Sequence, residues 1–150
     1  MDKIVSQIRT CSDPKLLKQW IKNAQLQGAE NVEREARIRL YAILPSAEPG
    51  TLEHEVWASI HALEDLESSK RGKTIRLQRT RNLIREVGER ACVERLLLKT
   101  TPSTGFDVLV QYGLPERLFE SIALRFPEGF SAVALANARS RLTSGGDFAA

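Results

Sequence analysis

The stretch TLEHEVWASIHALEDLESSKRGKTIRLQRTRNLIR, residues 51–85, carries the strongest pattern in this chain of 150 residues. Thr51 is a residue type that caps helices, and the acids that follow it favour the positive end of a helix dipole. Apolar residues then recur every three or four positions, which is the period of one buried helix face: Leu52, Val56, Ile60, Leu63 and Leu66. The stretch therefore begins with a long helix.

Charge reverses sharply within the same stretch. Residues 51–69 carry five acids and no base, whereas residues 70–85 carry seven bases and no acid, although the whole chain has a net charge of only +3. We call the seven bases the basic strip: Lys70, Arg71, Lys73, Arg76, Arg79, Arg81 and Arg85. The high isoelectric point thus comes from one segment, which weakens any expectation of non-specific binding over the whole surface.

Helical patterns continue on both sides of this stretch. Before it, Ser12-Asp13-Pro14 starts one helix, Gly28 ends it, and a second helix is expected from about Glu30 to Leu44. We interpret residues 1–44 as an N-terminal helical hairpin and the segment Pro45–Gly50, with two prolines and a glycine, as a linker.

Residues 51–142 form the predicted main helical domain, and together with the hairpin they are expected to make one compact unit. In it, Thr74 is the expected cap of the basic helix, and Gly88 separates that helix from one over residues 89–99. Three short helices follow over residues 106–112, 115–126 and 131–142, and residues 143–150 read as a flexible tail. The fold class is all-α, a compact bundle of about seven or eight helices.

Composition argues against several function classes. The longest apolar runs fall far short of the ~20 residues of a membrane span, and we expect a cytoplasmic protein without membrane contact. Two cysteines, Cys11 and Cys92, make neither a disulfide framework nor a zinc site. The chain lacks a nucleophile elbow and a phosphate-cradling glycine loop, so we expect no enzyme and no cofactor.

The basic strip has two interpretations. Arg79, Arg81 and Arg85 fall on the helix side away from the apolar residues, and the guanidinium group suits phosphate because it donates two parallel hydrogen bonds. The strip then contacts nucleic acid, DNA rather than RNA, and positions it without reading sequence. Alternatively, the strip pairs with acids of the preceding helix, an ordinary charged interface: Glu53, Glu64, Asp65 and Glu67.

Two segments have the length of a helix-turn-helix reader, residues 78–98 and residues 106–125. In the first, Ile84 and Glu94 stand at unsuitable positions, and in the second, Glu116 and Glu120 would face phosphates. A plain helical hairpin is the preferred interpretation of both.

The alternative function is a protein-interaction module, an adaptor or inhibitor that uses the acidic helix and Trp57 for recognition. The basic strip would then provide charge complementarity to an acidic protein partner. The module's candidate residues lie on the long helix, where His54 and His61 share the face opposite the apolar stripe and Trp57 lies beside that stripe. Trp57 is then either covered by the hairpin or exposed as an anchor. Two histidines about 10 Å apart are too distant for one zinc ion, so no metal is expected. An exposed apolar stripe on a short C-terminal helix would make a dimer.

Overall fold

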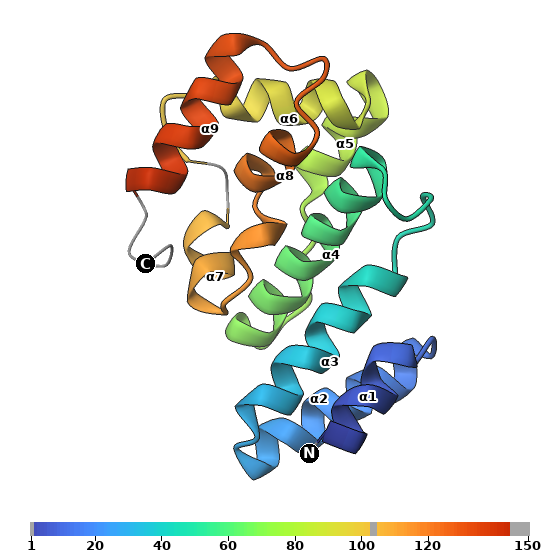
Figure 1. The fold of residues 1–150 in the computed structure, drawn as a ribbon. Coiled ribbons are helices and arrows are strands. Elements are labelled where there is room, and N and C mark those ends of the chain that lie inside the picture. Colours follow the sequence, from blue (N-terminus) through green and yellow to red (C-terminus); the bar gives the residue numbers. More distant parts are fainter. Residues whose placement is uncertain (1, 103–104, 145–150) are drawn as a thin grey trace. The chain divides into compact units, whose positions relative to one another are not determined.

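The computed structural model describes residues 2–102 and 105–144. Within these ranges the chain forms nine α-helices, one short 3-10 helix and no strand, which confirms the all-α class (Figure 1). The helices are α1 (Asp2–Thr10), α2 (Pro14–Gln27), α3 (Glu30–Ile43), α4 (Leu52–Arg71), α5 (Gln78–Val87), α6 (Glu89–Leu97), α7 (Phe106–Gln111), η1 (Pro115–Arg117), α8 (Phe119–Arg125) and α9 (Ala132–Ser144). The helix that the sequence patterns did not indicate is α1.

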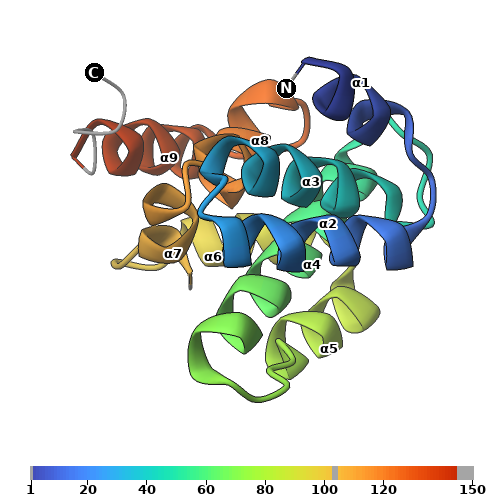
Figure 2. The same cartoon turned by 90° about the horizontal axis from the view of Figure 1, so that it is seen from below.

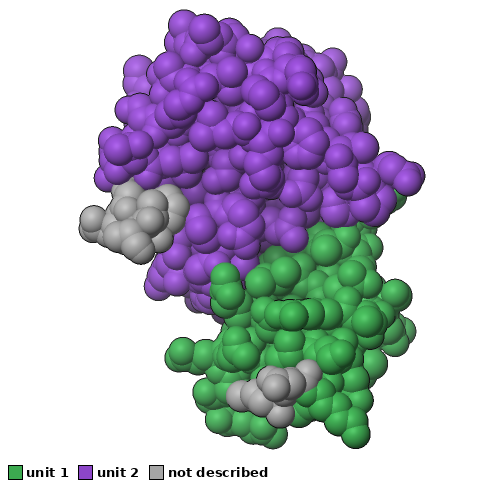
Figure 3. Space-filling view, viewed as in Figure 1, with its two compact units in different colours: residues 1–46 green, residues 47–150 purple. Residues whose placement is uncertain are grey.

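The chain divides into two compact units, residues 1–46 and residues 47–150 (Figure 3). The division falls inside the proline- and glycine-containing segment Pro45–Gly50. Such a segment cannot continue a helix, because proline lacks the amide hydrogen and restricts the residue before it.

Unit 1, residues 1–46, consists of α1, α2 and α3, with α1 and α2 both packed on α3. Asp13 caps α2 as expected, and its Oδ1 accepts a hydrogen bond of 3.0 Å from the amide of Lys15. Gly28 ends α2 with a φ of 68°, a left-handed conformation that glycine adopts without strain. The predicted α2–α3 hairpin is therefore present.

Unit 2, residues 47–150, is organised around α4, which contacts α6, α7, α8 and η1. The expected apolar stripe of α4 is buried, since Val56, Ile60 and Leu66 are all 0% exposed. Core residues on α4, α5, α6, α8 and α9 form one hydrophobic cluster with it, among them Ile84, Val93, Phe119 and Ala134. Burying these side chains supplies the main driving force for folding unit 2.

Both ends of α4 follow from its sequence. The Oγ1 of Thr51 accepts a hydrogen bond from the amide of His54 at 3.2 Å, as the capping pattern predicted. At the other end, Gly72 has a φ of 68° and donates its amide hydrogen to the carbonyl of Ser68. The helix thus has 20 residues and reaches into the basic strip.

Two expected helix boundaries are wrong. Thr74 does not cap the basic helix, because residues 74–77 are not helical and α5 begins only at Gln78. The predicted helix over residues 115–126 is interrupted at Leu118, whose ψ of 142° is extended, so η1 and α8 are separate.

Most of the predicted flexible tail lies outside the described residues, and Thr143 and Ser144 form the end of α9. Among the helices that are described, none combines the length and apolar composition needed to cross a bilayer.

Candidate nucleic-acid interface

The basic strip extends over three consecutive pieces of unit 2: the last turn of α4, the connection of residues 72–77, and α5. Figure 1 shows the connection running back along α4 before α5 begins, and Figure 2 shows α5 beside α4. Six members of the strip are exposed to solvent, and one is half-buried. The exposed members are Lys70, Arg71, Lys73, Arg76, Arg79 and Arg85.

Two side chains of α4 fasten the connection. Ser68 Oγ accepts a hydrogen bond of 2.8 Å from the amide of Ile75, and Glu64 Oε2 accepts one of 2.8 Å from the amide of Leu77. Ser68 and Glu64 are one helical turn apart, and the residues they hold are two apart, so they fix the connection along α4. Ile75 and Leu77 are partly buried, whereas Arg76 between them is exposed.

Arg81, the half-buried member of the strip, forms an ion pair with Glu64. Its Nε and Nη2 donate hydrogen bonds of 2.7 Å each to the two carboxylate oxygens, and the side chains are only 16% and 10% exposed. Burial alone would raise the pKa of Glu64, but the hydrogen bonds from Arg81 and Leu77 outweigh it and bring that pKa below its ordinary value. The same bond raises the pKa of Arg81.

The expected pairing of the strip with acids of α4 therefore holds for part of it. Besides Arg81, Arg71 pairs with Glu67 at 3.2 Å, but this arginine is 58% exposed, and such pairs contribute about 0–1 kcal/mol. Arg85 donates a hydrogen bond to Asn82 instead of pairing with an acid. Arg81 is less accessible to a ligand than the exposed members of the strip, because its guanidinium group already binds a buried carboxylate.

Trp57 is half-buried and not fully exposed. Its ring packs against the core of unit 2, and its Nε1 donates a hydrogen bond of 3.0 Å to Glu89 at the start of α6. The guanidinium carbon of Arg81 lies 5.3 Å from the ring centroid, within cation–π range. Glu64, Arg81, Trp57 and Glu89 therefore form a continuous contact between α4, α5 and α6.

The two histidines do not share an exposed face. His54 is buried at 6% exposure, and its Nδ1 lies 3.3 Å from Glu55 Oε2, whereas His61 is half-buried. Burial and the nearby charge of Arg81 lower the pKa of His61, so it is neutral at pH 7. The apolar face of α4 is wider than one stripe, and it includes His54.

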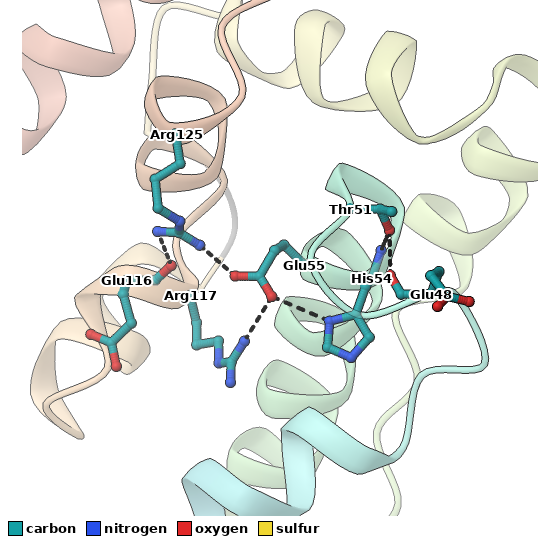
Figure 4. Close-up of polar contacts among 7 residues, drawn as sticks. All are labelled: Glu48, Thr51, His54, Glu55, Glu116, Arg117 and Arg125. Carbon is teal, nitrogen blue, oxygen red and sulfur yellow. Dashed lines mark hydrogen bonds and ion pairs between the residues drawn. The ribbon is translucent and has the colours of Figure 1, made fainter.

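A second polar cluster joins α4 to η1 and α8 (Figure 4). Glu55 accepts a hydrogen bond of 2.7 Å from Arg125 and lies 3.6 Å from Arg117, while Arg125 also donates to the carbonyl of Glu116. Burial would raise the pKa of Glu55, but Arg117 and Arg125 outweigh it and hold the pKa below its ordinary value. One carboxylate thus binds two arginines from two further elements, which marks the cluster as a structural link.

Cys92 and the metal-ligating residue types are the remaining chemistry-bearing groups. Cys92 is 0% exposed, and burial raises the pKa of its thiol to about 11, so it is protonated at neutral pH. Across residues 2–102 and 105–144, no three His, Cys, Asp or Glu residues lie close enough to hold a metal ion.

The sequence analysis named Glu64 as a possible partner of the strip, but it did not identify Ser68 or the hold of either residue on the connection. The sequence signal for residues that hold the connection is weak. It consists of a serine and an acid one helical turn apart on the helix that precedes the basic segment. In comparisons with known proteins, no family model, no curated protein and no solved structure matches this chain.

Proposed function

We propose that unit 2 is a non-catalytic nucleic-acid-binding unit that contacts phosphates through the exposed cations of the basic strip. The single observation that carries the proposal is the state of four cations, Lys70, Lys73, Arg76 and Arg79. All four are exposed, and within the described part of the chain their side chains make no hydrogen bond or ion pair. Four exposed cations so close in sequence create a locally positive potential that attracts anions such as phosphates.

The members of the basic strip differ in whether an acid of the protein binds them. Arg81 is a member of the strip that an acid of α4 neutralises, because Glu64 binds it through both carboxylate oxygens. The four exposed cations form no such hydrogen bond, although the charge of Arg76 also helps to lower the pKa of Glu64. All four remain accessible to phosphate oxygens, with Arg76 and Arg79 able to donate bidentate hydrogen bonds. Contacts of this kind fix the position of a nucleic acid and are insensitive to its sequence.

The rival interpretation is a protein-interaction module anchored by Trp57, and the contacts of Trp57 inside unit 2 weaken it. The indole nitrogen of Trp57 donates to Glu89 and one ring face lies under Arg81, so this residue stabilises unit 2. An acidic protein could still use the basic strip, and the binding test separates the two partners.

The test is fluorescence anisotropy of a short labelled DNA titrated with the wild-type protein and with two double variants. Arg76→Ala/Arg79→Ala removes two exposed cations of the strip, and Lys18→Ala/Lys22→Ala removes two exposed cations of α2. We expect the first variant to bind about tenfold more weakly at 50 mM salt and the second to bind as the wild type does. Equal weakening by both variants would mean that DNA binding depends only on the net charge of the protein, and it would contradict the proposal.

A further inference from the structure

We infer that the nucleic acid held by the basic strip is a duplex, bound along its sugar–phosphate backbone, and not a single strand. This inference rests on the proposed function and names the class of nucleic acid that is bound. It follows from three features of the strip: the lack of aromatic residues, the fixed backbone between its two helices, and the density of its cations.

A single strand is usually bound by stacking its bases on aromatic side chains, each worth about 1–3 kcal/mol. The basic strip offers no such platform, because residues 58–105 contain no Phe, Trp or Tyr. The neighbouring Trp57 cannot serve either, since its ring packs on the core and under Arg81, and its nitrogen donates to Glu89. A strand bound here would have phosphate contacts alone.

The backbone that carries Arg76 and Arg79 is held in place before any ligand binds. Ser68 and Glu64 fasten the connection to α4 through the amides of Ile75 and Leu77, with Arg76 exposed between them. Arg79 stands in the first turn of α5, two residues before Arg81, which Glu64 also binds. With this backbone fixed, the conformational entropy lost on meeting an equally rigid row of phosphates is that of the exposed side chains alone.

A flexible single strand would instead have to be ordered on the basic strip, and no stacking energy would offset that cost. The duplex also presents its charge more densely, about one phosphate per 1.7 Å of axis when both strands are counted. Four exposed cations within ten residues, from Lys70 to Arg79, therefore meet more phosphates on a duplex.

The experiment compares a labelled dT homopolymer with the dA·dT duplex of the same length, each titrated with the full chain at 100 mM salt. We expect the duplex to bind at least tenfold more tightly. In a Trp20→Phe background, the emission of Trp57 should stay unchanged on saturation with either DNA, because no base stacks on it.

Two results would count against the inference in different ways. Binding of dT as tight as that of the duplex, or quenching of Trp57 by dT, overturns the duplex inference while the proposed function stands. Absence of binding to both DNAs removes the proposed function itself, and this inference with it.

Discussion

Glu64→Gln is the substitution that tests most directly how unit 2 holds its basic strip. The change keeps the shape of the side chain and removes its charge. Glu64 accepts three hydrogen bonds of 2.7–2.8 Å, two from Arg81 and one from the amide of Leu77, and it is 8% exposed. A neutral amide has one oxygen acceptor, and its NH2 group would face the donors of Arg81.

The expected cost follows from the burial of the pair. Hydrogen bonds to charged groups contribute about 1.5–3 kcal/mol each, and removing one partner of a fully buried pair costs about 3–5 kcal/mol. Because Arg81 keeps 16% exposure and can rehydrate partly, we expect a loss of about 2–3 kcal/mol in the free energy of unfolding of unit 2. Glu67→Gln on the same helix is the matched control, since its partner Arg71 is 58% exposed, and it should cost less than about 0.5 kcal/mol.

The assay is urea unfolding followed by tryptophan fluorescence in a Trp20→Phe background, so that Trp57 alone reports on unit 2. The pKa of Glu64 is lower in the folded state than its ordinary value. Its contribution is therefore complete above the unfolded value of about 4.3 and is lost as pH falls through the folded pKa. We expect the difference between wild type and Glu64→Gln to be full at pH 7 and to shrink below about pH 4. Equal stability of the two variants at pH 7, or a difference that does not change with pH, would refute this reasoning.

Three further outcomes are expected from local geometry. Cys92, with a pKa of about 11 and no exposure, should resist alkylation at pH 8 under native conditions, while the partly exposed Cys11 reacts, as intact-mass spectrometry would record. Gly105→Ala should destabilise unit 2 more than Gly72→Ala in urea unfolding. A Cβ at residue 105 would lie 2.1 Å from the buried side chain of Leu63, whereas a Cβ at residue 72 meets nothing within 4 Å. Thr51→Ala should cost about 1 kcal/mol in the same assay through loss of the helix cap, and a serine there should restore most of it.

Local signals in the sequence were enough to predict most of the fold. Asp13 and Thr51 cap their helices through contacts with residues two or three positions later, so the capping pattern is complete within a few residues. The apolar period of α4 likewise predicts its buried face. The start of α5 was not predictable in this way, because the amide of Leu77 is bound by Glu64, 13 residues earlier.

The candidate site shows the same division between local and distant causes. The sequence places the seven cations together, but it does not reveal which of them folding neutralises. Arg81 is bound by a residue 17 positions away, and Trp57 by Glu89, 32 positions away. Such pairings depend on how helices pack, which periodicity alone does not determine. His54 was misplaced for a related reason, since a helix packed on several neighbours buries more than one stripe.

The salt dependence of duplex binding is the most direct test of the claim that exposed cations of the basic strip contact phosphates. Each neutralised phosphate contributes about 0.9 to the slope of log K against log salt, so contacts by four to five cations predict a slope of about −4. Arg76→Ala/Arg79→Ala should make this slope shallower by about 1.8, and Lys18→Ala/Lys22→Ala should leave it unchanged. A wild-type slope near zero, or one that the Arg76→Ala/Arg79→Ala variant retains in full, would contradict the account.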